Sequence, residues 1–220
     1  GSAEAHAMGK KYFLTSYSMP HNSKIKTSIK ALAPIIDMGP DALIMADPGL
    51  IMMVRENWPD MPIHLSVQAN TVNYAAVKFW QSIGLERIIL SRELSLEEIQ
   101  EIRQHCPDME LEVFVHGALC VAISGKCYMS LATYNSSANR GACLQNCRRS
   151  YKVIDEETGQ ELVLDNKYVM SPKDLCTIGF VDKLIEAGVS VFKIEEKNMI
   201  ITGIVEIIST PLITWVKFNE

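Results

Sequence analysis

Four of the six cysteines, Cys120, Cys127, Cys143 and Cys147, lie in a 28-residue window with the spacing Cys-x6-Cys-x15-Cys-x3-Cys. Thiolates are soft ligands, and four of them suit an iron–sulfur cluster or a tetrahedral zinc ion. The sequence has no Cys-x2-Cys pair of the kind typical of structural zinc, which favours the cluster. The alternative is that these cysteines are small buried apolar residues. Cys176, further along the chain, is an alternative candidate for the fourth ligand.

Positive charge is concentrated in the same segment. Between Glu112 and Asp155 the chain has no acidic residue, although its net charge as a whole is -5. Arginine suits phosphate oxygens, so this pattern indicates local binding of nucleic acid or another anion. Exposed aromatic rings would add stacking surfaces for unpaired bases. The alternative is that these cations offset thiolate charge or solvate a loop. The residues concerned are Lys126, Arg140, Arg148, Arg149 and Lys152, with Tyr128, Tyr134 and Tyr151.

Short apolar runs alternate with segments of helical spacing, and these elements must position the site. The helical segments are residues 23–37, a segment beginning at Pro48, and residues 96–105, which Ser95 and Glu98 open as a capping box. The spacing between strands is that of a strand plus a crossover helix, so the strands should be parallel. The predicted strands are residues 12–18, 42–46, 63–68, 87–91, 112–116 and 191–195.

This pattern predicts an α/β fold, an incomplete (β/α) TIM-like barrel, with a doubly wound open sheet as the alternative. Either architecture places active residues at the carboxyl ends of strands. We therefore take His116, Gln68, Arg92 and Glu195 as candidate catalytic residues. Asp47, Asn70 and Glu93 share that position in the sequence.

The chain divides into a barrel-like domain over residues 1–195 and a C-terminal tail over residues 196–220. A cysteine-rich insertion, residues 117–167, follows the strand that ends at His116, and within it residues 151–154 and 161–164 are expected to pair as a hairpin. Connections this long are generally functional or disordered.

Composition excludes several classes of protein. The chain has 220 residues, 48% of them hydrophobic, so it can bury one sizeable core. No apolar run is long enough for a membrane span, no signal peptide is evident, and the cysteines are too sparse for a disulfide scaffold; a cytoplasmic protein is expected. The motifs of common hydrolases and nucleotide-binding proteins are absent from the sequence.

Three blocks of the chain closely resemble the signature of the collagenase-like peptidase family, unclassified peptidase family 32. Shorter blocks, His64 to Asn70, Ser171 to Cys176 and Phe192 to Glu195, are similar to further parts of that family. The segment 37–98 resembles the bacterial tRNA hydroxylation proteins of the family. The signature blocks read Glu112-Val-Phe-Val-His116-Gly-Ala-Leu-Cys120, Ser124-Gly-Lys-Cys127-Tyr-Met-Ser130 and Asn139-Arg-Gly-Ala-Cys143-Leu-Gln-Asn-Cys147-Arg148.

The resemblance implies a barrel-like catalytic domain and an RNA-modifying hydroxylase that forms 5-hydroxyuridine at the tRNA wobble position with prephenate as hydroxyl source. It implies that Cys120, Cys127, Cys143 and Cys147 hold an iron–sulfur cluster, with zinc as the alternative metal. We expect Arg140, Arg148 and Arg149 to bind RNA phosphates or the carboxylates of prephenate. The alternatives are a collagenase-like peptidase and a metal-stapled, non-enzymatic binding module.

Two departures from the family pattern matter. Family members have a strand, a helix and a second strand before the first segment found here, so we expect an open barrel whose exposed edges pair two chains into a homodimer. Relatives continue Lys-Ile-Glu with Gly-Arg, whereas here Glu195 is followed by Glu196 and an apolar run over residues 200–208. The tail therefore diverges from the family, and this chain by itself is expected to lack activity.

Overall fold

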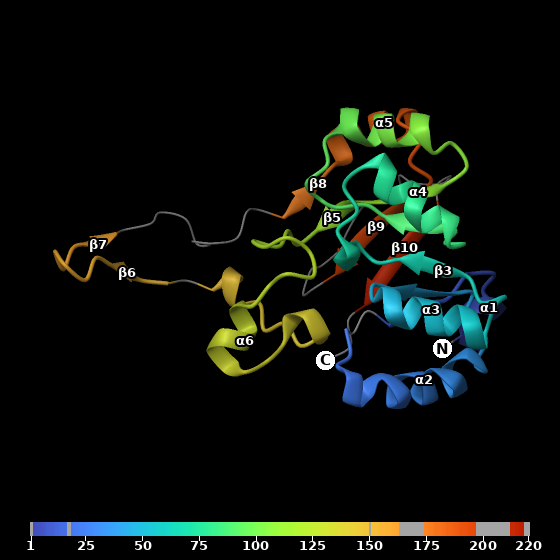
Figure 1. The fold of residues 1–220 in the computed structure, drawn as a ribbon. Helices are drawn as coiled ribbons and strands as arrows, with labels where there is room; N and C mark the ends of the chain where they lie inside the picture. The colour runs from blue at the N-terminus through green and yellow to red at the C-terminus, as the bar shows by residue number, and fades with distance from the viewer. Residues whose placement is uncertain (1, 17–18, 150, 163–173, 197–211, 218–220) are drawn as a thin grey trace.

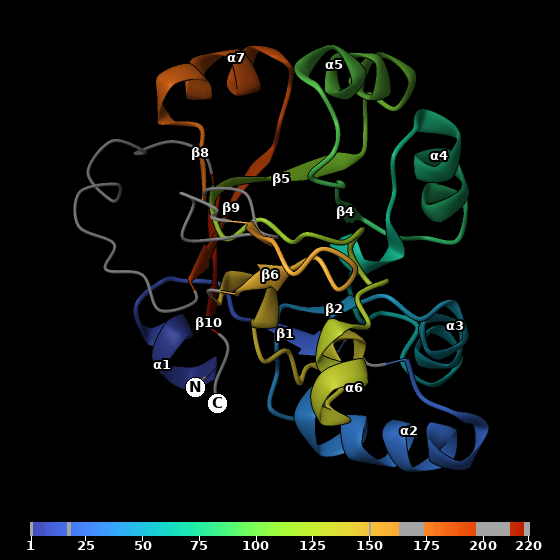
Figure 2. The ribbon, with the colours of Figure 1, turned by 90° about the vertical axis from the view of Figure 1, so that its left-hand side faces the viewer.

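The computed structural model describes residues 2–16, 19–149, 151–162, 174–196 and 212–217. Its centre is a curled eight-stranded sheet in which seven strands run parallel in the order β1-β2-β3-β4-β5-β9-β10, and β8 (Leu175–Cys176) pairs antiparallel with β5. Figure 2 shows the sheet curling with the helices around its outer side. The parallel strands are Phe13–Ser16 (β1), Ala42–Met45 (β2), Ile63–Leu65 (β3), Arg87–Ile89 (β4), Glu110–Gly117 (β5), Val191–Glu196 (β9) and Leu212–Lys217 (β10).

The six predicted strands are confirmed with shifts of a few residues at their ends. In the described part of the chain β1 and β10 are not paired with each other, so the sheet is a curled half-barrel and not a closed cylinder. Because the helices lie outside the curl, the doubly wound alternative is wrong (Figure 2). The predicted apolar run at 200–208 lies outside the described residues, and β10 extends the sheet beyond it.

In the described part of the chain, three α-helices begin after a residue whose side chain accepts a hydrogen bond from a backbone N–H of the first turn. Asp47 accepts a hydrogen bond from the Leu50 backbone N–H, and Ser95 and Glu98 form the predicted capping box. The outer helices are Asn22–Ile36 (α2), Pro48–Asn57 (α3), Tyr74–Ser82 (α4), Leu96–His105 (α5) and Val181–Glu186 (α7), and Ser2–Ala7 (α1) precedes β1 (Figure 1). No helix in the described ranges is long and apolar enough to cross a membrane.

Alternate residues of the strands face two separate apolar cores. The larger core lies between sheet and helices and contains Leu43, Leu65 and Ile88. The smaller core contains Ile44, Ile89 and Phe114 and lies on the inner side of the curl. The inner side therefore has little apolar filling and leaves room for polar groups.

The chain after β5 leaves the sheet. It forms the short helix α6 (Met129–Tyr134) and the hairpin strands β6 (Val153–Ile154) and β7 (Glu161–Leu162), which pair as predicted. In Figure 1 this segment lies beyond the ends of the strands, and the hairpin projects away from the body. Residues 163–167 of the predicted insertion lie outside the described residues.

Candidate functional site

A cavity opens at the carboxyl ends of the strands, where parallel barrels carry their sites. Its empty space is about 1200 Å³, including the part open to solvent. The inner core forms its floor, and residues 118–148 form its cover. Gln68, Arg92 and Glu195, three of the four predicted catalytic residues, line it, and so do all four clustered cysteines.

Two glycines allow close backbone approaches at this end of the barrel. A Cβ atom on Gly117, whose φ is +127°, would lie 2.4 Å from the carbonyl oxygen of Glu195. A Cβ atom on Gly125, whose φ is +78°, would lie 2.5 Å from the carbonyl oxygen of Gln68. Only glycine tolerates both a positive φ and these close approaches. Gly117 therefore allows β5 to approach β9 where the chain leaves the sheet, and Gly125 sets where the cover rests on the barrel.

The four thiols are not in disulfides, and all of them line the cavity, where their charges affect one another. Cys120 is partly exposed, yet desolvation raises the pKa of its thiol, and Glu195, Cys143 and Cys147 raise it further while Arg92 lowers it. Burial, followed by the charges of Cys143 and Cys127, likewise raises the pKa of Cys147. Negative charge on one sulfur thus disfavours charge on the others. A cationic centre would remove this repulsion and stabilise the thiolates.

The sulfur atoms are nevertheless not arranged as a finished coordination sphere. Among the described residues, no three His, Cys, Asp or Glu side chains are placed so that they could hold a metal ion. The donor set and its shared cavity fit a thiolate-bound centre, and binding one would require the cover to draw the sulfurs together. The cluster ligands therefore stay a prediction.

Arg92 and Glu195 form an ion pair inside the cavity. The Arg92 guanidinium also donates to Ser124 Oγ over 3.3 Å and lies 3.5 Å from the centroid of the Phe114 ring. Their side chains are only 10% and 13% exposed, so water screens the pair weakly. The pair joins β9 to the end of β4 and to the cover.

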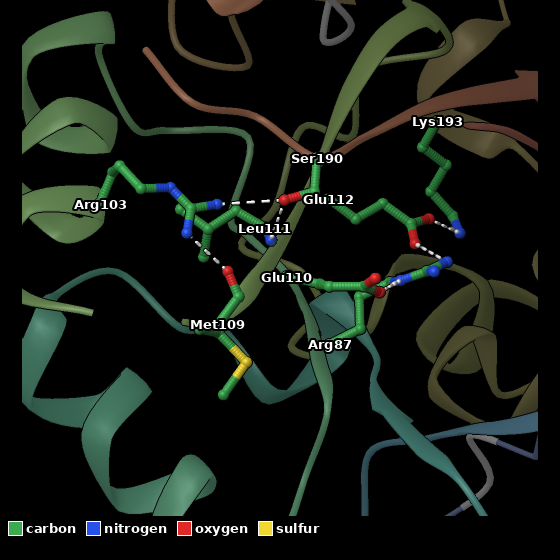
Figure 3. A network of polar contacts seen from close by, with 8 residues as sticks. All are labelled: Arg87, Arg103, Met109, Glu110, Leu111, Glu112, Ser190 and Lys193. Carbon is green, nitrogen blue, oxygen red and sulfur yellow. Dashed lines mark hydrogen bonds and ion pairs between the residues drawn. The ribbon is translucent and has the colours of Figure 1, made fainter. Parts of the chain in front are cut away.

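Below this pair, a network of buried charges crosses the inner side of the sheet (Figure 3). Lys193 Nζ donates to Glu112 Oε1 over 2.6 Å, and Arg87 lies 3.5 Å from the other oxygen of Glu112 and 2.8 Å from Glu110. Lys193 also lines the cavity. Burial, followed by the charges of Arg87, Lys193 and Lys11, lowers the pKa of His64 to about 3, so His64 is neutral at pH 7.

His116 lies apart from the other predicted catalytic residues. The register of β5 against β9 shifts between Phe114 and His116, where His116 pairs with Ile194 on β9 and with Cys176 on β8. His116 is not among the residues that line the cavity. His116 thus ends its strand as expected but does not line this cavity, and its catalytic role stays a prediction. Cys176 is exposed and does not line the cavity either.

The three predicted substrate-binding arginines lie on the cover. Arg140 is exposed and contacts His21 at the start of α2, Arg149 donates to the Tyr134 hydroxyl over 2.7 Å, and Arg148 lines the cavity and pairs with Asp174. Sequence reasoning missed Lys193 and Glu112. The signal that could have found them is the strand alternation that places Glu112 with Phe114, and Lys193 with Glu195, on one face.

Comparison with known proteins gives a family and several relatives. A family model described as Peptidase family U32 matches residues 1–208. The chain is 46% identical, over an alignment 242 positions long, to tRNA hydroxylation protein P of Escherichia coli (strain K12); the alignment covers 90% of this chain and 53% of that protein. It is 44% identical over 164 residues to Collagenase of Porphyromonas gingivalis (strain ATCC BAA-308 / W83), covering 70% of this chain and 39% of that protein.

A third relative is the 23S rRNA 5-hydroxycytidine C2501 synthase of Escherichia coli (strain K12). The chain is 37% identical to it over 191 residues, covering 87% of this chain and 28% of that protein. The chain thus spans about half or less of the length of these three curated relatives.

Proposed function

Because the chain belongs to peptidase family U32, we propose that it forms part of an enzyme that hydroxylates a base in RNA. The observation that carries the proposal is the shared cavity, which places four cysteines beside buried cations at the carboxyl end of a parallel sheet. Two relatives named for RNA hydroxylation support the reaction class. In its finer form the proposal is formation of 5-hydroxyuridine at the tRNA wobble position.

We assign the iron–sulfur cluster to Cys120, Cys127, Cys143 and Cys147. A cluster held there would supply redox chemistry beside the cavity. Replacing a base C–H by C–OH oxidises the base by two electrons. We propose prephenate as the hydroxyl source and the electron acceptor: its C–OH bond would break as it takes up the two electrons and the proton released from the base. Arg92 and Gln68 would orient the reactants within the cavity, and the cover would limit access of water to it.

The RNA-binding surface would extend from the cover onto α2. Helix α2 contains Lys24, Lys26 and Lys30, all exposed, and no acidic residue. Its first turn meets the cover at the contact between His21 and Arg140. The lysines and the exposed arginines Arg140 and Arg149 thus form a region of one charge sign, which suits a phosphate backbone.

A peptidase activity has weaker support, although one relative is named Collagenase. In the described part of the chain, no Ser or Cys side chain is hydrogen-bonded to a His, which is the arrangement that activates a nucleophile in most serine and cysteine peptidases. Hydrolysis of gelatin by the purified protein, abolished by substitution of a single cavity residue, would favour the peptidase instead.

The test is anaerobic purification followed by iron and sulfide analysis, and mass spectrometry of nucleosides from tRNA incubated with the protein and prephenate. We expect iron and sulfide in the wild type, their loss in Cys143→Ala, and their retention in Cys176→Ala, because Cys176 lies outside the cavity. Hydroxylated uridine should appear with the wild type. Zinc instead of iron, with no modified nucleoside, would contradict the proposal and favour a metal-stapled binding module.

RNA binding has a separate measurement. The double variant Arg140→Ala/Arg149→Ala should weaken tRNA binding and reduce the slope of log K against log salt by about 1 for each phosphate that the variant no longer neutralises. Lys10→Ala, an exposed lysine before β1 at the opposite end of the sheet, is the matched control and should bind as the wild type. If the double variant binds tRNA with the wild-type affinity and salt dependence, as Lys10→Ala should, RNA is removed from the assignment.

A further inference from the structure

The hairpin that follows the cover is the part of the described chain with the most exposed surface. Among the described residues, β6 and β7 pair with each other and form a sheet separate from the curled one. All residues from 151 to 161 are exposed, and Figure 1 shows the hairpin projecting from the body. A two-stranded hairpin by itself is at best marginally stable in water, so a partner surface would stabilise this one.

Hydrogen bonds hold the tip of the hairpin in one conformation. Asp155 Oδ1 accepts bonds from the backbone N–H groups of Glu157 and Thr158 over 2.9 and 2.8 Å, and the Gly159 N–H donates to the Asp155 carbonyl over 2.8 Å. Bonds from Thr158, followed by the bond from Glu157, lower the pKa of Asp155, so its carboxylate is charged at pH 7. A tip that is ordered in advance loses little conformational entropy when it binds.

The hairpin is acidic. Residues 151–162 contain four acidic residues and one basic residue, a net charge of -3. Lys152 pairs with Glu161 over 3.0 Å, so the negative charge is concentrated at the tip. This acidic tip consists of Asp155, Glu156 and Glu157. It repels phosphate and disfavours RNA as the partner. The exposed apolar side chains of Tyr151, Val153 and Ile154 next to it suit a protein surface.

The same chain carries the complementary surface. We call it the basic region: Lys24, Lys26 and Lys30 on α2, with Arg140 and Arg149 on the cover, all of them exposed. Opposite charges on two surfaces steer their association and fix its orientation. The hairpin follows the cover directly, and Figure 2 shows both on the side that faces the viewer. Two copies related by a twofold axis could therefore make the same contact twice.

We propose that two copies of this chain associate through their hairpins, with the acidic tip of each copy on the basic region of the other. This contact is separate from the open sheet edges at β1 and β10. A second copy would also cover the surface proposed to bind RNA, so that dimer and RNA complex exclude each other. Only this last consequence rests on the proposed function.

Sedimentation of the full chain at several protein concentrations, in low and in high salt, measures the association. We expect dimers at low salt that dissociate at high salt, because the Debye length falls from about 10 Å at 0.1 M to about 3 Å at 1 M salt. A chain that stays monomeric at low salt, or a dimer that salt does not affect, would overturn the proposal.

Exchange of charge between the two surfaces tests the residues. Glu156→Lys/Glu157→Lys and Lys26→Glu/Lys30→Glu should each weaken self-association about 10-fold or more, because each places like charges opposite each other. A mixture of the two variants should restore dimers, since both contacts then join opposite charges. Misfolded variants would not recover on mixing.

The matched control is Glu56→Lys/Glu101→Lys, which reverses two exposed charges on the outer helices α3 and α5 and should dimerise as the wild type does. Wild-type association of either surface variant, or no recovery in the mixture, would overturn the contact.

Addition of tRNA separates this proposal from the proposed function. tRNA should dissociate the wild-type dimer, and dimers that keep their size with tRNA bound would overturn the contact. If the chain hydroxylates RNA but is monomeric at low salt, the dimer is overturned and the proposed reaction stands. Dimers that recover by charge exchange, without any RNA binding or hydroxylation, would do the reverse.

Discussion

Replacing Gly125 by alanine tests whether the cover is held to the barrel by a direct backbone contact. A Cβ at this position would lie 2.5 Å from the carbonyl oxygen of Gln68 and 3.2 Å from its Cβ, at a φ of +78°. The left-handed conformation costs an alanine about 1–2 kcal/mol. Forcing an extra atom into a packed contact adds about 1–3 kcal/mol. We therefore expect Gly125→Ala to lower the free energy of unfolding by about 2–5 kcal/mol or to release the cover.

Gly141 is the matched control within the same segment. Its φ is +88°, but a Cβ there would meet no atom within 4 Å, so Gly141→Ala carries the backbone cost alone. Urea unfolding gives the free energies, and the rate of thiol labelling at Cys120 and Cys127 in the metal-free chain reports whether the cover has moved. Labelling should accelerate in Gly125→Ala and not in Gly141→Ala. Equal losses of stability and equal labelling rates would refute the contact.

Three further predictions concern the scaffold. The pKa of His64 is lowered to about 3, so below the usual pKa near 6.5 the unfolded chain binds a proton that the folded chain does not. Stability should fall by about 1.4 kcal/mol per pH unit as the pH drops through this window, and His64→Gln should remove that slope in urea titrations at several pH values; an unchanged slope contradicts the argument. Arg103 donates to the Met109 carbonyl and to Ser190 Oγ (Figure 3), and also to the carbonyl of Gly188. Arg103→Met should therefore cost about 2–4 kcal/mol of unfolding free energy by thermal or urea denaturation, and wild-type stability would show that these bonds contribute nothing. Ser95→Ala removes the capping box of α5 and should lower the free energy of unfolding by about 1 kcal/mol in the same assay. A variant as stable as the wild type would contradict this prediction.

The strands and their carboxyl ends were predictable because their signals are local. Apolar runs, glycine after helices and the Ser95–Glu98 box each act within a few residues, and the structure has the corresponding elements. Gln68, Arg92 and Glu195 were placed by the same rule, that the ends of parallel strands meet at one edge of the sheet.

What the sequence did not predict depends on pairing between distant strands. His116 follows a register shift in β5, and neither the shift nor β8 has a local signal. The bond between Lys193 and Glu112 joins residues of β9 and β5 that are far apart in the chain, and charge alone does not say which carboxylate a lysine will meet. The closeness of Gly125 to Gln68 is likewise a property of the folded chain.

The contribution of β9 to the cysteine-lined cavity has a consequence for biosynthesis. The cysteine-rich segment precedes β9 in the chain, yet Lys193 and Glu195 of β9 line the same cavity as its four cysteines. A ribosome therefore delivers Cys120, Cys127, Cys143 and Cys147 before it delivers the strand that completes their support. Until β9 has been synthesised, the cavity that these cysteines line is incomplete. We therefore expect an inorganic centre bound at this site to be loaded after Glu195 has been synthesised, and the thiols to be reduced until then.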